Sequence, residues 1–236
     1  VTISDLYNSI KRIRGKLLNK KGERHLLRLT PNIIDVWYSK FRWFYTSSNK
    51  LGVMGKDNNQ NIALIKKYTD SSDLVLHADI FGSPFCILKN ASMDDEEDIL
   101  EAAIMTASYS SAWKNGLSSI DVYCVRREQV TLSPPSGESL KSGAFYIEGK
   151  RRYIKNCPLG IYLNIKIEDN KYELLATPKP YYKHYFSIKP GNKKAEDIID
   201  KIYNTIADKL KVEISKNDIS RFIPNGRSMI DAIKLD

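Results

Sequence analysis

Apolar residues recur at helical spacing through the first 17 residues of the chain. They would share one face of a helix, while the lysines and arginines between them fill the other face. The run Asn19–Gly22 ends the pattern. Two interpretations stay open: a short amphipathic helix docked on the core, or the stub of a longer, truncated helix. We assign residues 1–36 to this helical segment and a linker. The apolar positions are Ile3, Leu6, Tyr7, Ile10, Ile13 and Leu17.

A core region of short strands with inserted helices is predicted for residues 37–160. The segments Arg42–Thr46 and Leu51–Met54 alternate as strands on either side of a polar turn, which is typical of a hairpin. Asp57, with Gln60 three residues later, forms a capping-box pattern and predicts the start of a helix. The expected buried side of that helix consists of Ile62, Ile65 and Tyr68.

Further strands are predicted at 74–80, 85–89, 120–125 and 144–147. The acidic run Asp94–Asp98 indicates the first turn of another helix, because carboxylates complement the positive end of the helix dipole. That helix is expected to reach Trp113 and to stop at Asn115-Gly116.

The C-terminal part, residues 161–236, has a different pattern. Four apolar residues alternate from Ile161 to Ile167, Asp169-Asn170 forms a turn, and Tyr172–Leu175 returns. Another strand at 185–188 is followed, through Pro190-Gly191, by a long amphipathic helix with Ile198, Ile202, Ile206 and Leu210 inward. The order of elements predicts an α+β fold. We expect a mixed, mainly antiparallel sheet with packed helices, plus a C-terminal α/β extension.

Composition adds a charge argument. The chain of 236 residues carries 37 Lys and Arg against 28 Asp and Glu, a net charge of +9, which favours nucleic acid or another polyanion as a partner. Charge alone leaves open a merely solubilising role. No apolar run approaches the roughly 20 residues of a membrane helix, so no membrane partner is expected. The 3 cysteines are widely spaced, which disfavours a disulfide framework or zinc site and suits a cytoplasmic protein.

Two short segments carry candidate chemistry. Gly55–Asn61 lies at a strand-to-helix junction, where free backbone N–H groups beside Lys56 would bind a phosphate; a simple capped turn is the alternative. His77 and Asp79 would share one face of a strand. A catalytic pair, two metal ligands and a hydrogen-bonded support for RNA are the options for them. We favour a buried or binding role, since no third metal ligand stands at suitable spacing. No cofactor is predicted.

A basic and aromatic stretch surrounds the loop Ser133–Glu138. Arginines precede it, and Lys141, Lys150 and Arg151 follow. Aromatic side chains interleaved with cations suit RNA, because bases stack on rings while cations neutralise phosphates. The alternative is a core of aromatics with a solvated basic rim. The aromatic residues are Tyr123, Phe145, Tyr146 and Tyr153.

A string of motifs from Trp37 to about Gly160 resembles the NFACT-R domain in order and spacing. The tail, with Phe222–Gly226, is similar to the extension of archaeal members. The motifs are Trp37-Tyr38, Lys40-Phe41-Arg42-Trp43-Phe44, Gly55-Lys56-Asp57, Gln60-Asn61, Lys66-Lys67-Tyr68, His77-Ala78-Asp79, Gly82-Ser83, Lys89-Asn90, Ser111-Ala112-Trp113-Lys114, Pro135-Ser136-Gly137-Glu138 and Gly143-x-Phe145-x-Ile147-x-Gly149-Lys150. Lys56 stands where many members have Arg, and Pro84-Phe85 stand where smaller or β-branched residues are common.

The resemblance implies the RNA-contacting module of a ribosome quality-control tailing factor, historically labelled fibronectin-binding-protein-like. It implies tRNA and large-subunit rRNA as partners, with peptide bonds made by the ribosome rather than by this chain. The family's N-terminal domain is not recognisable here, and the first helix resembles the end of the family's coiled coil. A C-terminal fragment is therefore expected, and the N-terminal domain would be a partner. The candidate RNA contacts are Lys56, Asp57, Lys66, Lys67, His77, Asp79, Lys89, Arg126, Arg127, Lys141, Lys150 and Arg151.

Two competing functions stay open on the sequence. One is a metal-dependent nucleic-acid-processing enzyme that uses His77 and Asp79. The other is a protein–protein interaction module on the ribosome.

Overall fold

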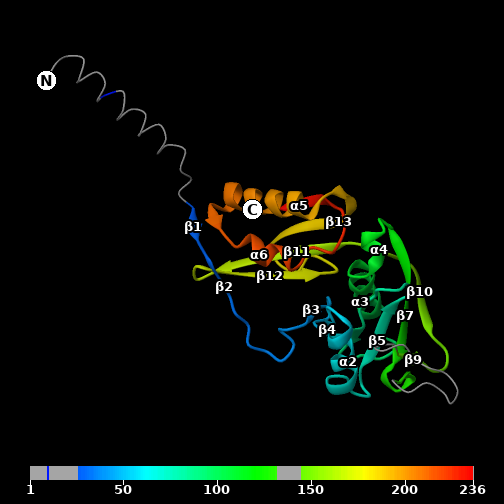
Figure 1. The fold of residues 1–236 in the computed structure, drawn as a ribbon. Coiled ribbons are helices and arrows are strands. Elements are labelled where there is room, and N and C mark those ends of the chain that lie inside the picture. The colour runs from blue at the N-terminus through cyan, green and yellow to red at the C-terminus, as the bar shows by residue number, and fades with distance from the viewer. Residues whose placement is uncertain (1–9, 11–25, 132–144, 236) are drawn as a thin grey trace.

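A computed structural model of the chain describes residue 10, residues 26–131 and residues 145–235 (Figure 1). The expected first helix, the loop Ser133–Glu138 and Lys141 lie outside the described residues.

A six-stranded sheet forms the first half of the structure, and all its neighbouring strands are antiparallel. The predicted hairpin is confirmed, with Asn49 at positive φ in its turn. The strands, in spatial order, are β10 (Arg152–Pro158), β7 (Ser119–Arg126), β5 (Leu74–Ala78), β6 (Cys86–Leu88), β4 (Leu51–Met54) and β3 (Arg42–Tyr45). A short pair, β8 (Val130–Thr131) and β9 (Tyr146–Ile147), lies beside it after the 3-10 turn η1 (Arg127–Gln129).

Two helices pack on opposite faces of this sheet. Helix α2 (Asn58–Lys67) begins at Asp57, as predicted, because the Asp57 carboxylate accepts a hydrogen bond from the Gln60 N–H at 2.9 Å. Its buried apolar residues, Leu64 and Ile65, pack against Val53, Val75 and Ile87. Helix α3 (Glu96–Ser108) packs its alanines and Met105 on the other face, against Leu74, Leu76 and Cys124.

The prediction of a single helix as far as Trp113 is wrong, because the segment forms two helices. Helix α3 ends at Ser108, and α4 (Ser111–Lys114) starts anew. The Ser110 hydroxyl accepts a hydrogen bond from the Ala112 N–H and so caps the second helix. The predicted stop at Asn115-Gly116 is confirmed, with Gly116 at positive φ.

A second, five-stranded sheet follows, and it includes a short strand from before the first sheet. In spatial order it contains β15 (Ser228–Lys234), β13 (His184–Lys193), β11 (Ile161–Glu168), β12 (Lys171–Thr177) and β2 (Thr30–Pro31). Helix α5 (Ala195–Leu210) lies along this sheet and buries Ile198, Ile202 and Ile206, as predicted. It is followed by β14 (Val212–Glu213), which pairs in parallel with β1 (Leu27–Arg28), and by α6 (Lys216–Ser220).

The strand expected at 185–188 is longer than predicted, because Pro190-Gly191, expected to lead into the helix, still belongs to β13. Pairing of β13 with β11 ends at Ile188, so beyond that point only β15 is a neighbour. The missing N–H of Pro190 therefore costs no ladder hydrogen bond to β11.

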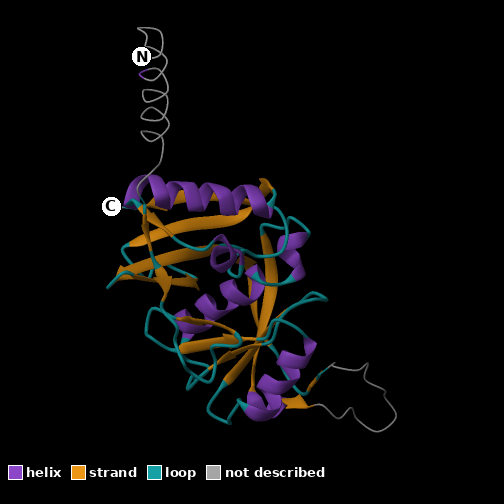
Figure 2. Ribbon diagram, turned by 60° about the vertical axis from the view of Figure 1, so that its left-hand side comes forward, coloured by secondary structure: helices purple, strands orange, loops and turns teal. Residues whose placement is uncertain are grey.

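One hydrophobic cluster joins the two sheets, since it contains residues of β5 and β7 as well as of β11, β13 and α5. Hydrogen bonds also bridge the halves: for example, the Trp113 indole donates to the Ser228 hydroxyl at 3.1 Å, and the Tyr109 hydroxyl donates to the Phe222 carbonyl at 2.7 Å. Figure 2 shows α5 at one end of the molecule and α2 towards the other. The α+β fold class with mostly antiparallel sheets is confirmed.

Among the described residues, no helix combines the length and hydropathy needed to cross a membrane.

Candidate nucleic-acid interface

Aromatic side chains form a continuous ladder across β6, β5, β7 and β10, on the face of the six-stranded sheet that α2 partly covers. Strand alternation explains the position: Val75 and His77 share this face, whereas Leu76 and Ala78 enter the other core cluster. Ring centroids lie 4.6 Å apart for Phe85 and His77, 5.6 Å for His77 and Tyr123, and 6.0 Å for Tyr123 and Tyr153. The ladder runs from the buried Phe85 to Tyr153, which is 37% exposed.

His77 is an uncharged member of this ladder at neutral pH. Burial lowers the pKa of its imidazole from 6.5 to about 4. Its Nδ1 atom is buried and has no hydrogen-bond partner among the described residues. A neutral imidazole of this kind adds ring surface and one polar atom rather than a positive charge.

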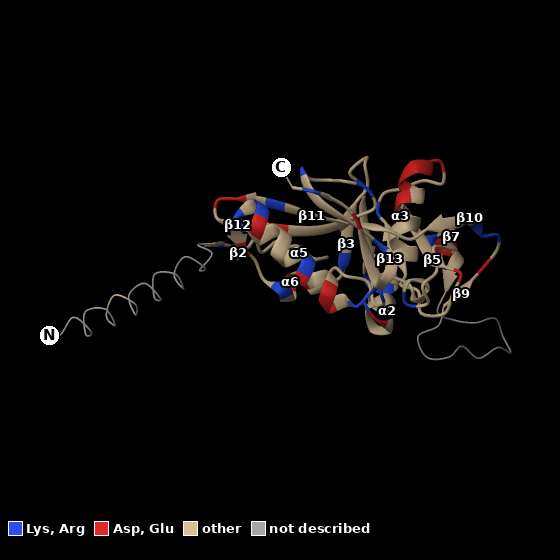
Figure 3. Ribbon diagram, turned by 90° about the horizontal axis from the view of Figure 1, so that it is seen from above, with Lys and Arg blue, Asp and Glu red and all other residues tan. Residues whose placement is uncertain are grey.

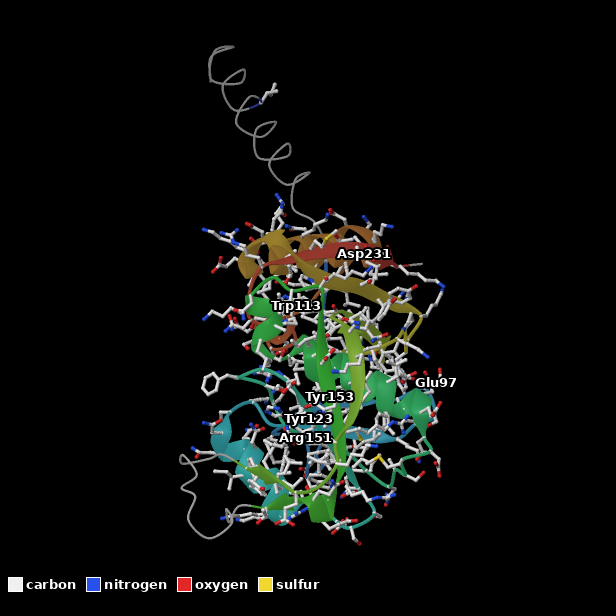
Figure 4. All side chains as sticks on the ribbon, turned by 90° about the vertical axis from the view of Figure 1, so that its right-hand side faces the viewer. Glu97, Trp113, Tyr123, Arg151, Tyr153 and Asp231 are labelled. Atoms are coloured by element: carbon white, nitrogen blue, oxygen red, sulfur yellow. The ribbon has the colours of Figure 1, made fainter. Side chains whose placement is uncertain are left out.

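Two cations lie over the last two rings of the ladder, the buried Tyr123 and the exposed Tyr153. The Arg151 guanidinium lies 4.7 Å from the Tyr123 ring centre, and the Lys155 ammonium lies 4.4 Å from that of Tyr153. Lys155 also pairs with Asp121 at 2.7 Å. Figure 4 shows Tyr123, Arg151 and Tyr153 close together on the face turned to the viewer.

Lys155 and Asp121 were missed by the sequence reasoning, because β10 was not predicted as a strand. The signal was present: in Arg151–Lys155, alternate residues bear a cation, a tyrosine and a cation. The intervening Arg152 lies on the opposite face, where its guanidinium donates to the Met93 carbonyl and pairs with Glu96.

The ladder continues as a basic strip towards the end of α2. The Gln129 amide donates to the Lys150 carbonyl at 3.0 Å, and its side-chain oxygen accepts from the Arg126 N–H. Arg127 in turn donates to the Ile65 carbonyl at 3.1 Å. These bonds place η1 beside the turn that precedes β10 and beside the last turn of α2. We name this surface the basic–aromatic strip; it comprises Lys66, Lys67, Lys150, Arg151, Lys155, His77, Tyr123 and Tyr153. The predicted contact Arg126 lies on the other face of the sheet, opposite Leu74 and on the same side as Cys124.

A second aromatic group lies beyond the end of α2. The Trp37 and Tyr68 rings stack at 4.8 Å with planes 5° apart, and the Lys40 ammonium donates to the Tyr68 hydroxyl at 2.8 Å. That hydrogen bond lowers the pKa of Tyr68. Trp37 is 42% exposed, so a stacking surface stands next to Lys66 and Lys67 in the last turn of α2. Figure 3 shows blue, basic segments of the ribbon around α2.

Phe81, which sequence reasoning also missed, projects from the β5–β6 loop and is 99% exposed. The loop is held by the Ser111 hydroxyl, which donates to the Phe81 carbonyl at 2.5 Å. Asp79 is exposed in the same loop, and its N–H donates to the Asp121 carbonyl. A fully exposed phenylalanine in an anchored loop offers a further stacking surface.

Several predicted contact residues are engaged within the protein. The Lys89 ammonium pairs with the buried Asp73 at 2.5 Å and donates to the Tyr68 carbonyl. Arg127 donates to two carbonyls, those of Val130 and Ile65. Their cationic groups therefore support the fold.

The start of α2 is a capped turn. The Asp57 carboxylate occupies the helix N-terminus, and the Gln60 side chain accepts from the Lys56 N–H at 3.0 Å rather than from Asp57. This arrangement favours the capped turn over the phosphate site for the free N–H groups. The Lys56 ammonium points away and donates to the Lys40 carbonyl.

The described residues contain no group of three or more His, Cys, Asp or Glu arranged to hold a metal ion.

Comparisons with known proteins identify relatives of this chain. Residues 40–149 match the family described as NFACT protein RNA binding domain. The archaeal Rqc2 homolog aRqcH of Methanocaldococcus jannaschii is 38% identical over 195 residues, 80% of this chain and 28% of that protein. The ribosome quality control complex subunit NEMF homolog of Drosophila melanogaster is 36% identical over 152 residues, 61% of this chain and 15% of that protein.

The corresponding NEMF subunit of Mus musculus is 34% identical over 120 residues, 50% of this chain and 11% of that protein. This chain therefore spans less than a third of the length of these curated relatives. A solved structure, the C-terminal part of the fibronectin/fibrinogen-binding protein from Streptococcus suis, has 19% identity and a TM-score of 0.43, covering 63% of this chain and 56% of that chain.

Proposed function

We propose that this chain, whose residues 40–149 form an NFACT RNA-binding domain, is the RNA-contacting part of a ribosome quality-control factor. The relatives named for ribosome quality control support the cellular role. The basic–aromatic strip is the observation that carries the RNA contact, because it pairs exposed cations with rings on one surface.

The finer proposal concerns the RNA. We propose that the strip contacts tRNA and rRNA of the large subunit, and that the factor supports message-independent extension of a stalled nascent chain in the cytoplasm. The ribosome would make the peptide bonds, so this chain would bind rather than catalyse. The family's N-terminal domain would supply the remaining tRNA contacts. In this proposal residues 37–160 are the RNA-binding unit and residues 161–236 support it.

The strip divides the predicted residues by role. Arg151 and Lys150 would neutralise phosphates, and the exposed Tyr153 would stack on a base. The buried Tyr123 would support Arg151 from below, and neutral His77 would hold the ring geometry. Asp79 lies at the edge of the strip, where a carboxylate accepts hydrogen bonds from sugar hydroxyls or base amines.

The test is a titration of tRNA and of large-subunit rRNA fragments against the chain at several salt concentrations. Each lost phosphate contact should reduce the slope of log affinity on log salt by roughly 0.7 to 0.9. Lys150→Ala and Arg151→Ala should each do so, and Tyr153→Ala should weaken binding with little change in slope. Lys201→Ala, an exposed lysine on α5, is the charge-matched control.

The outcome that contradicts the proposal is an affinity for RNA that is salt-independent, or equal in the strip variants and the control. Metal-dependent RNA cleavage that His77→Ala abolishes would instead establish an enzyme. Crosslinking on the ribosome that captures protein and no RNA would favour a protein-binding module.

A further inference from the structure

A cavity of about 480 Å³ lies where the two sheets meet, away from the basic–aromatic strip. The first sheet and α3 contribute Trp43, Met54 and Tyr109, and the C-terminal half contributes Leu174 and Phe222. The residues before the first sheet, from Pro31 to Ile34, also line it. Most of its wall is thus apolar or aromatic, and its volume falls in the range of small-molecule sites.

Three cations converge on this apolar space: Arg42, Lys56 and Arg221. Burial and the nearby Arg42 and Arg221 lower the pKa of Lys56, in that order of importance. Arg42 lies over the Tyr109 ring at 4.7 Å, and its buried Nε atom has no hydrogen-bond partner among the described residues. An unpartnered guanidinium N–H in such a place is a donor that a bound anion would satisfy.

Of the two carboxylates of the cavity, only Asp218 forms an ion pair with one of these three cations, Arg221. Glu173 accepts a hydrogen bond from the Tyr182 hydroxyl at 2.8 Å. Asp218 accepts one from the Tyr172 hydroxyl and pairs with Arg221 at 3.3 Å. In the part of the chain that the structure describes, neither Arg42 nor Lys56 has a carboxylate within salt-bridge distance. Within the described residues Arg42 and Lys56 thus have no ion-pair partner, and the Lys56 ammonium donates only to the Lys40 carbonyl.

We propose that this cavity binds a nucleotide, with the phosphate on Arg42, Lys56 and Arg221 and the base against the aromatic wall. The guanidinium of Arg42 supplies a fork that suits phosphate oxygens, and Lys56 supplies a point charge. The cavity draws residues from both sheets and from the segment before them, so a bound nucleotide would hold the two halves together. This inference goes beyond RNA binding at the strip and does not depend on it.

The same chemistry is presented by a free mononucleotide and by one nucleotide of an RNA strand. Calorimetric titration of the whole chain with AMP, GMP, UMP, adenosine, inorganic phosphate and short oligoribonucleotides distinguishes the sources. A mononucleotide should bind at least tenfold more tightly than adenosine or phosphate and should raise the melting temperature. Binding by oligoribonucleotides but not by mononucleotides assigns the site to an RNA strand.

The variants Lys56→Gln and Arg221→Gln should each weaken this binding about tenfold, whereas Lys201→Gln on α5 should not. Circular dichroism checks that each variant is folded. Arg151→Gln, which changes the strip alone, should leave mononucleotide binding unchanged, so failure of the two proposals is distinguishable. Absence of binding by every nucleotide ligand at millimolar concentration, or binding that survives both cavity variants, overturns the proposal.

Discussion

At the scale of one residue, His77 makes the unfolding free energy of the protein depend on pH. Its pKa is lowered to about 4 in the folded protein from 6.5 in the unfolded chain, so the unfolded state binds the proton first. Stability from the neutral imidazole is full above pH 6.5 and is lost as the pH falls towards 4. The loss should reach on the order of 3 kcal/mol.

Chemical denaturation at a series of pH values measures this effect. His77→Phe keeps a ring in the ladder and should flatten the fall in unfolding free energy between pH 6.5 and 4. His184→Phe leaves His77 in place and should retain the fall. Equal acid sensitivity in the His77 variant would show that other groups cause it.

Lys89 was predicted to contact RNA, but its ion pairs indicate that it stabilises the fold. Its ammonium pairs at 2.5 Å with Asp73, whose side chain is 0% exposed, and at 3.2 Å with Asp70, whose side chain is 78% exposed. Removing one partner of a buried pair leaves an uncompensated charge, so Asp73→Ala should cost about 3 kcal/mol of unfolding free energy. Asp70→Ala, the matched control, should cost less than about 0.5 kcal/mol.

Lys89→Ala should likewise destabilise the fold in urea denaturation. If Lys89 only supports the fold, the affinity of Lys89→Ala for RNA, measured at a temperature where this variant is folded, should stay within about twofold of that of the unmodified chain. A large loss of affinity in a fully folded variant would return Lys89 to the RNA contacts predicted from the sequence.

At the scale of elements, the β3–β4 hairpin depends on one glycine. A Cβ atom at Gly52 would lie 2.1 Å from Cζ of the buried Phe44, so an added methyl group forces the ring from its place. Gly52→Ala should cost about 1–3 kcal/mol by overpacking. At Gly160 the nearest atoms would be 3.7 Å away, so Gly160→Ala is the control and should change stability little. Thermal unfolding of both variants decides the point.

The sequence predicted elements whose local signals agree with their tertiary setting. The alternation of Ile161–Ile167 and the Asp57 cap of α2 are such cases, because each can be read within a few residues. Strand β10 was not predicted, since Arg152–Pro158 has few apolar residues and an irregular register between Ile154 and Cys157. The break between α3 and α4 contains neither Gly nor Pro, so only the cap at Ser110 reveals it.

Only those parts of the candidate site that a local sequence pattern marks could be predicted. Arg151 and Lys150 could be expected from the clustering of charge, and their neighbour Lys155 follows once β10 is known. The ion pair that engages Lys89 joins residues 16 positions apart, and the cavity at Arg42 joins the two halves of the chain. Such contacts depend on tertiary packing, which no local pattern encodes.

At the scale of the whole molecule, the two sheets share one hydrophobic cluster and are bridged by the Trp113–Ser228 and Tyr109–Phe222 hydrogen bonds. Neither half can unfold without exposing apolar surface of the other. The chain should therefore unfold in a single cooperative transition.

Tryptophan fluorescence and circular dichroism test this coupling, because they report on different halves of the chain. All 3 tryptophans, Trp37, Trp43 and Trp113, belong to the first half, whereas far-ultraviolet circular dichroism also reports α5 and the second sheet. The two unfolding curves should coincide in urea. Combining Trp113→Phe with Ser228→Ala should give a coupling energy of about 1 kcal/mol, since each change removes the same hydrogen bond. A dichroism transition without a matching fluorescence change would mean that the second sheet unfolds on its own.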